Sequence, residues 1–354
     1  MATLVDWDLA ERIARAAAGE GPAAMSGKLD LEAIGERSRK AVLGYTRLNP
    51  AEPIPQPEWV SRREWTQINL DSMRALIEPL ERRAGETFPP GPAGAGLAAL
   101  TGRVLGAQVG GLLGLASRRV LGQYEFPLLG PERPSRLVFV GENIDHAARE
   151  LGGEPADVLE WVALHEMTHA VHFSAAPWLR GHLGALASTL LEDTPLKLST
   201  ADVLAGARRL VSSDPRQLLA ELRDADPVSL LAPAESQETI ARVQATMAAV
   251  EGYAEHAMDA AAGELGSAVA GLREGLERRR ENRGTLARVL SWLLGFEMKL
   301  RQYRDGKDFA DAVVELEGID GLNRAWTGAE AMPTLAELAS ARAWFERVSV
   351  PSSA

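Results

Sequence analysis

Apolar residues recur every three or four positions along most of the chain, which is the spacing of helices that bury one face. Prolines gather between these stretches, at residues 50–57, 88–92 and 131–134, and mark loops. Runs typical of strands are few: Arg136–Val140 is short, apolar and rich in β-branched and aromatic residues, and 124–129 is a weaker candidate. The pattern predicts a mainly α fold with a small β element.

Two long helices stand out in this pattern. The first is predicted over residues 154–173, opened by a proline at its first turn and ended before Pro177. The second is predicted over about 235–262. Between them, residues 183–238 contain several proline breaks and are predicted as an insertion of shorter helices that can roof a cleft. A densely charged stretch at 271–283 is expected to be a solvated helix.

A stripe of glycines marks an apolar segment nearer the start of the chain. Gly102, Gly106, Gly110 and Gly114 recur every fourth residue, which lets another helix approach closely. Arginines at 103, 118 and 119 limit the uncharged apolar stretch to residues 104–117, short of the roughly 20 residues that a membrane-spanning helix needs. We therefore expect a buried packing helix and no membrane span.

Composition narrows the function classes. The chain has 354 residues, 38 basic and 49 acidic, so its formal net charge of −11 disfavours nucleic acids and anionic membranes as partners. It has no cysteine, so a bound metal has to be held by histidine and carboxylate. Asp6, Asp8 and Glu11 interrupt the segment where a signal peptide would be apolar, which favours a cytoplasmic location.

The residues that carry chemistry lie in the first long helix, as His165-Glu166-x-x-His169. Residues four apart on a helix are neighbours, so both imidazoles can bind one ion. Glu166 lies about 100° round the helix from His165, where it can act on a metal-bound water without being a ligand. The motif predicts a Zn²⁺ site with Glu166 as general base.

A catalytic zinc usually takes three protein ligands and leaves one position for water. The residues that directly follow His169 do not supply a third ligand, so it is expected from the second long helix. Glu251 and Glu255 are four apart there and face the same way. One can bind the ion and the other can accept the spare N–H of a ligating histidine, and the spacing leaves the choice open.

The motif His165-Glu166-x-x-His169 followed by Glu251-Gly252-x-Ala254 resembles the gluzincin metallopeptidases. This resemblance implies that Glu251 is the third zinc ligand and that Glu255 supports a histidine. The chain departs from the family at Val250, where asparagine is frequent, and in the 82 residues that separate Glu251 from His169.

Other segments extend the resemblance over most of the chain to a bacterial family of zincin-like, zinc-dependent hydrolases, common in actinobacteria and chloroflexi. They are Arg63-Glu64-Trp65-x-x-x-Asn69, the glycine stripe leading to residues 120–124, Pro177-Trp178-Leu179-Arg180, and residues 299–309. The resemblance implies a zincin-like helical core and an association with deazaflavin-cofactor biosynthesis that rests on co-occurrence between genomes.

Four further residues are candidates for the cleft. His172 falls on the same helical face as His169 and is expected to line the site. Tyr253, His256 and Tyr303 are alternative hydrogen-bond donors to the oxyanion of the reaction, and the sequence does not choose among them.

The sequence thus predicts one large, predominantly helical domain in three segments: N-terminal helices at 1–130, a metal-binding core at 131–301 and a C-terminal segment at 302–354. The predicted function is that of a zinc metallopeptidase acting on a peptide or small amide. Two alternatives stay open, a zinc hydrolase of a non-peptide amide or ester and a non-catalytic protein that binds a partner. A homo-oligomer is neither required nor excluded.

Overall fold

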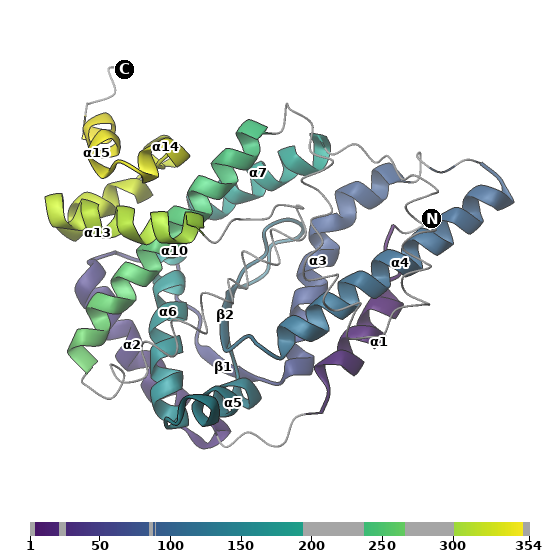
Figure 1. Ribbon diagram of the computed structural model, residues 1–354, viewed down its shortest axis with the longest axis horizontal. Coiled ribbons are helices and arrows are strands. Elements are labelled where there is room, and N and C mark those ends of the chain that lie inside the picture. The colour runs from purple at the N-terminus through teal and green to yellow at the C-terminus, as the bar shows by residue number, and fades with distance from the viewer. Residues whose placement is uncertain are drawn as a thin grey trace.

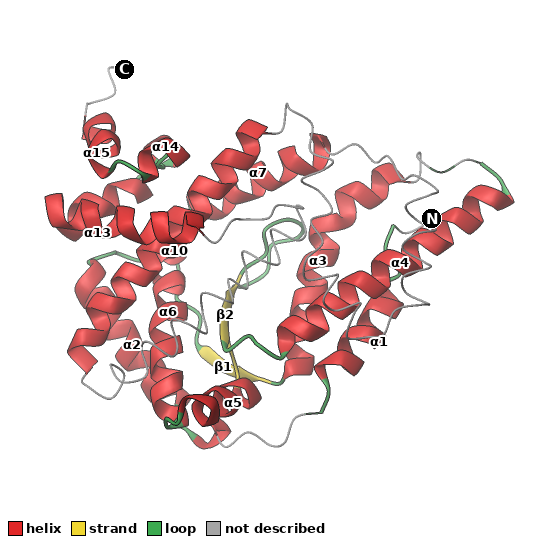
Figure 2. Cartoon of the chain, in the orientation of Figure 1, coloured by secondary structure: helices red, strands yellow, loops and turns green. Residues whose placement is uncertain are grey.

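The computed structural model describes residues 4–20, 26–84, 88, 90–193, 237–265 and 301–349. Helices dominate this part of the chain, around a small central sheet (Figure 2), and the prediction of a mainly α fold is confirmed. The predicted insertion is described only as far as residue 193, and the rest of it, like the charged stretch at 271–283, lies outside the described residues.

The sheet has three strands in the order β1-β3-β2: β1 (Pro57–Val60), β2 (Gly122–Glu125) and β3 (Arg136–Val140). β1 runs parallel to β3, and β2 runs antiparallel to it with Tyr124 opposite Leu137. The prediction of β3 is confirmed, whereas β2 begins two residues before the expected run. β1 lies at the end of a proline-rich segment that the pattern assigned to a loop, and Pro57 is tolerated because it is the first residue of an edge strand.

The sheet separates two hydrophobic cores. Alternate side chains of a strand point to opposite faces, so Leu137 and Phe139 of β3 join one core while Val138 and Val140 join the other. The first core lies with α6 and α10, and the second lies with α1, α3 and α4 (Figure 1). β1 and β2 come from the segment 1–130 and β3 from the segment 131–301, so the sheet joins the two segments; the segment boundaries stay a prediction.

Three helices contribute side chains to the second core: α1 (Trp7–Ala18), α3 (Arg62–Ala84) and α4 (Pro92–Ser117). The glycine stripe of α4 lies against α1, where a Cβ on Gly106 or Gly110 would collide with the backbone carbonyl of Asp6 or Ala10. The close helix packing expected from the stripe is confirmed.

α4 is longer than the apolar stretch suggested, because the helix continues through an exposed arginine at position 103. Its 26 residues make it the one helix in the described ranges that is long and apolar enough to cross a membrane, with a mean hydropathy of 1.2 over its best window. Of that window, 44% is buried inside the protein. α4 is thus weakly apolar, and its glycine face is covered by α1.

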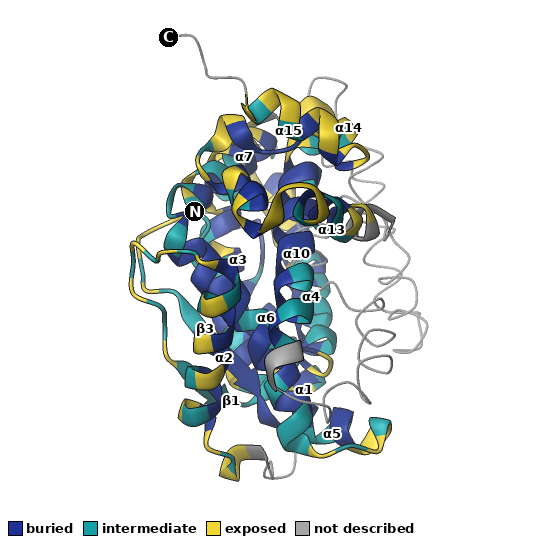
Figure 3. Ribbon diagram, turned by 90° about the vertical axis from the view of Figure 1, so that its left-hand side faces the viewer, coloured by how far each residue is buried: buried dark blue, intermediate teal, exposed yellow. Residues whose placement is uncertain are grey.

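The other helices surround the first core. They are α2 (Leu31–Thr46), α5 (Gly141–Leu151), α6 (Pro155–Ala175), α7 (Trp178–Asp193), α10 (Gln237–Leu265), α13 (Arg301–Leu322), α14 (Leu335–Leu338) and α15 (Ala341–Ser349), with short 3-10 turns at Ser26–Lys28, Asn323–Trp326 and Ala329–Ala331. α6 contacts α2, α10 and β2, and it is buried along most of its length (Figure 3). The two long helices of the sequence pattern, α6 and α10, therefore lie side by side.

Candidate metal centre

α6 brings two imidazoles together. His165 and His169 are one turn apart, and their Nε2 atoms are 3.1 Å from each other. The two rings are nearly perpendicular, at 80°. Buried neighbours on the helix, among them Leu164 and Met167, fix α6 in the core. Since a buried helix holds its side chains in few rotamers, the two nitrogens converge on a common point.

α10 adds a carboxylate to this pair. One Glu251 oxygen lies 3.8 Å from His165 Nε2, and the other lies 3.7 Å from His169 Nε2. The three side chains are only 10–15% exposed. In the described residues this is the one group of histidine and acidic side chains whose ligand atoms all lie within 4.8 Å of one another.

The donor set fits zinc. Two ligand atoms at 2.0–2.1 Å from a tetrahedral zinc are about 3.3 Å apart, and the three donors here are separated by 3.1 to 3.8 Å. Two histidines and one glutamate are also a set found in catalytic zinc sites that keep a fourth position open. His165, His169 and Glu251 are therefore suited to hold Zn²⁺.

Glu166 is oriented by the sheet. Its Oε2 accepts a hydrogen bond of 2.9 Å from the backbone N–H of Tyr124 in β2. β2 comes this close because residue 122 is glycine: a Cβ there would be 2.8 Å from Val162 and 2.9 Å from Glu166. The carboxylate thus lies on α6 next to the two histidines, held by an edge strand.

The sequence of the chain matches the model of a known family. The model of the zincin-like metallopeptidases matches residues 5–345. This chain belongs to that family. The zincin-like core expected from the sequence is confirmed, and family membership implies a metal, typically zinc, for the donors described above.

One solved structure is similar over nearly the whole zincin-like chain. It is the crystal structure of a presumed hydrolase with a novel fold from Chloroflexus aurantiacus, 27% identical, with a TM-score of 0.71, covering 97% of this chain and 98% of that one. No curated protein shows significant similarity to the chain. The family and this neighbour together support a hydrolase.

Within the described residues, the group of donors in this zincin-like protein includes none of the other candidates. Glu255 lies one turn beyond Glu251 on α10 and is partly buried. His172 is fully buried against Trp326, with ring centroids 3.9 Å apart. Neither of its ring nitrogens has a hydrogen-bond partner among the described residues. Burial, and next the proximity of His169, lower the pKa of His172 well below its usual range, so the ring is neutral.

Two of the three proposed oxyanion donors are bonded elsewhere. The hydroxyl of Tyr253 donates to Asn323 at 2.9 Å, and burial raises the pKa of that hydroxyl. His256 lies 2.6 Å from Asp311 and 2.5 Å from the hydroxyl of Tyr45 through its two ring nitrogens. Tyr303 belongs to the first turn of α13, and its side chain lies outside the described residues.

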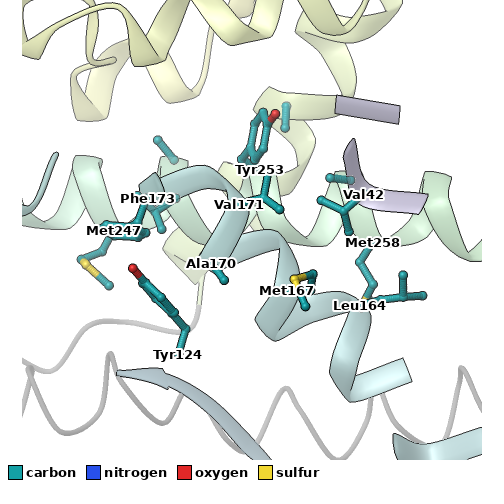
Figure 4. Packing of buried hydrophobic residues seen from close by; sticks show 14 of the residues in the cluster. Val42, Tyr124, Leu164, Met167, Ala170, Val171, Phe173, Met247, Tyr253 and Met258 are labelled. Atoms are coloured by element: carbon teal, nitrogen blue, oxygen red, sulfur yellow. The ribbon is translucent and has the colours of Figure 1, made fainter. Parts of the chain in front are cut away.

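Sequence reasoning assigned no role to Tyr124, although it stands in one of the segments that carry the family resemblance. Its ring lies against Phe173 of α6, with centroids 5.6 Å apart (Figure 4). Its hydroxyl accepts a hydrogen bond of 3.0 Å from Arg180, at the start of α7. Only the contact between β2 and α6 shows that Tyr124 adjoins Glu166, since the two are 42 positions apart in the chain.

Proposed function

We propose that this protein is a zinc-dependent metallopeptidase that hydrolyses peptide bonds. The observation that carries the proposal is the convergence of His165, His169 and Glu251 on one point. Glu166 lies next to His165 on α6. A purely structural zinc has no use for an adjacent base. Membership of the zincin-like metallopeptidase family supports the same reading.

In this mechanism the two histidines and Glu251 would hold the metal. Zinc, when bound, supplies a Lewis acid that lowers the pKa of its water and polarises the scissile carbonyl. Glu166 takes a proton from the attacking water and delivers it to the leaving amine, so that one water and one amide become a carboxylic acid and an amine. The hydrogen bond from the Tyr124 N–H keeps the Glu166 carboxylate oriented for this work.

The sheet favours a peptide over a small ester. β2 is an edge strand of the described sheet, and its Tyr124 N–H points away from β3, toward α6. Extended peptides bind such edges through main-chain hydrogen bonds. The Tyr124 N–H is already bound to Glu166, so a peptide laid along β2 would have to use other main-chain groups of the strand, and it would then lie beside Glu166. A cytoplasmic location and the association with deazaflavin-cofactor biosynthesis stay predictions.

The first test is the metal content of the protein, purified without a metal-binding tag and measured by elemental mass spectrometry. We expect about one zinc per chain in the wild type and a loss of zinc in His165→Ala and Glu251→Ala. Glu255→Gln is measured beside them, because the spacing leaves Glu255 as the alternative ligand and the resemblance gives it a supporting role. Zinc lost from Glu255→Gln but kept by Glu251→Ala would reverse the ligand assignment, and no metal in the wild type would end the hydrolase proposal.

The second test is the substrate class. The zinc-loaded protein is incubated with a peptide library and, in parallel, with a set of small amides and esters, and Glu166→Gln serves as the inactive control. Cleavage of peptides that depends on Glu166 supports a peptidase. Turnover of the small amides or esters alone would replace it with the non-peptide alternative.

A further inference from the structure

A closed chain of polar contacts begins and ends on α6. It starts at Glu166, whose carboxylate accepts from the Tyr124 N–H at 2.9 Å. The hydroxyl of the same tyrosine accepts from Arg180 Nη2 at 3.0 Å. The other terminal nitrogen of Arg180, Nη1, forms an ion pair of 2.8 Å with Glu52. The backbone N–H of Glu52 then donates to the carbonyl of Ser174 at 3.1 Å.

Ser174 lies on α6, about two turns beyond Glu166, so the contacts form a ring. The ring links the active-site helix to β2, α7 and the loop before β1. A second backbone bond, from the N–H of Ala51 to the same Ser174 carbonyl at 2.8 Å, strengthens its last link. Arg180 is the member that bridges two elements through its side chain alone.

We propose that Arg180 is a positioning residue for the reaction described above: it clamps Tyr124, and the backbone of Tyr124 fixes the carboxylate of Glu166. The inference rests on the proposed function. Arg180 suits the task because a guanidinium presents several donors in a rigid plane and can hold two partners at once. Its side chain is only 24% exposed, so solvent competes weakly for these contacts.

The clamp matters because, in the part of the chain that the structure describes, β2 has no neighbouring strand on the side that faces Glu166. The opposite face of β2 is held independently, by a reciprocal amide pair between Gln123 and Asn69 of α3 in which both contacts are 3.2 Å. Loss of Arg180 should therefore leave the strand paired with β3 and attached to α3. What it should release is the side of Tyr124 that faces the metal centre.

The test compares Arg180→Met with the wild type, zinc-loaded, on a peptide found in the substrate screen. A general base that is slightly misplaced can lose up to about 100-fold in rate, so we expect kcat to fall by about 10- to 100-fold. The zinc content should not change, because no metal ligand is removed, and the fall in kcat should exceed any rise in KM. Arg180→Lys, which keeps the charge but reaches one partner, should lie between the two.

Two further variants separate positioning from a general loss of stability. Tyr124→Phe removes only the hydroxyl that Arg180 binds, and it should lower kcat similarly, with no additional loss in the double variant with Arg180→Met. Arg37→Met is the matched control: Arg37 forms an ion pair of 2.8 Å with Glu160, also on α6 but away from the ring. It should leave kcat unchanged.

A readout without catalysis keeps the inference separable from the proposed function. Hydrogen exchange, followed on peptides that cover β2, should be faster at the Tyr124 amide in Arg180→Met and unchanged in Arg37→Met. If the wild type hydrolyses nothing, the function fails, while the exchange result still decides whether Arg180 fixes Tyr124. The inference is overturned by unchanged exchange, by a kcat equal to that of Arg37→Met, by additive losses in the double variant, or by loss of zinc from Arg180→Met.

Discussion

α10 carries two clusters of histidine and carboxylate that differ in how they are satisfied. On one side of the helix, Glu251 faces His165 and His169 at 3.7 to 3.8 Å. On another side, His256 contacts Asp311 directly at 2.6 Å. Both clusters combine histidine with a carboxylate. Only the first cluster leaves its ligand atoms at separations that suit a shared ion.

The second cluster completes its own polar contacts. His256 bonds to Tyr45 and Asp311 through its two ring nitrogens, and Lys307 Nζ lies 2.7 Å from Asp311 and 3.3 Å from Asp259. Burial raises the pKa of the Asp311 carboxyl, but hydrogen bonds from His256 and Lys307 outweigh it, and the net pKa is lowered. The comparison teaches that the type of residue does not define a metal site. The distances between its donors do.

The largest effect that tests this contrast is expected at Glu251. Glu251→Ala leaves two histidines for the metal, so zinc should fall from about one per chain to nearly none, and hydrolysis should become undetectable. Elemental mass spectrometry and a peptide assay measure both. Asp311→Asn is the matched change in the second cluster and should keep its zinc; loss of zinc there would mean that the two clusters act as one.

Glu166→Gln should separate metal binding from chemistry. The amide cannot accept the proton of the attacking water, and general-base catalysis contributes about 10²- to 10⁴-fold. We therefore expect kcat to fall by about that factor with zinc content unchanged. Stopped assays at saturating substrate, with metal analysis of the same sample, check it. Full activity in the variant would remove Glu166 from the mechanism.

A substitution in the second cluster should lower the free energy of unfolding and leave the zinc bound. Asp311→Ala deprives His256 and Lys307 of a hydrogen-bonded partner, which costs about 1–2 kcal/mol of unfolding free energy. Urea denaturation measures it. Glu346→Ala, which removes the exposed ion pair of Arg342 with Glu346, is the control and should change stability by less than about 0.5 kcal/mol.

His172 belongs to neither cluster. It is buried without a hydrogen-bond partner for either ring nitrogen among the described residues, and its ring packs against that of Trp326 at an angle of 59°. Because an unsatisfied buried polar group is costly, His172→Phe should hold or raise the unfolding free energy, by up to about 1 kcal/mol, with zinc retained. A thermal melt tests this, and a marked loss of stability would show that an imidazole nitrogen is needed there.

The smallest expected effect is the pH dependence of the second cluster. The folded pKa of Asp311 is lowered from 3.8, so its contribution to stability is present above pH 3.8 and is lost as the pH falls through the lower folded value. For Lys307, burial lowers the pKa. The contacts with Asp311 and Asp259 raise it by more than burial lowers it, so the net pKa lies above 10.5. Its contribution is present below pH 10.5 and is lost as the pH rises through the folded value.

Urea midpoints across the pH range measure this dependence. In Asp311→Asn the midpoint should decline less below pH 3.8 than in the wild type. It should also decline at a lower alkaline pH, because Lys307 then loses one of its two acidic partners among the described residues. Identical profiles for the two proteins would show that Asp311 is not linked to stability.

The sequence predicted the long helices well because their signals are local. Residues 154–173 and 235–262 were expected, and the helices span Pro155–Ala175 and Gln237–Leu265. Apolar spacing and a proline near each break suffice for such elements. The sequence did not predict β1, because β1 has no strand pattern of its own. Its proline-rich segment is stabilised as a strand by pairing with β3, about 80 positions later.

The sequence by itself also determined that two imidazoles share a face of the first long helix, since a spacing of four places His165 and His169 on one face whatever surrounds them. It did not determine which glutamate approaches them, because Glu251 and Glu255 share a face of their own helix. The packing of α10 against α6 decided that Glu251 lies within reach.

Tertiary structure alone also brought Tyr124 to Glu166 and Arg180 to Tyr124. These residues come from β2, α7 and α6, and no local periodicity relates their positions. Periodicity determines which face of an element is apolar. The relative placement of two elements depends on the volumes that fill the space between them, and that is a property of the folded core.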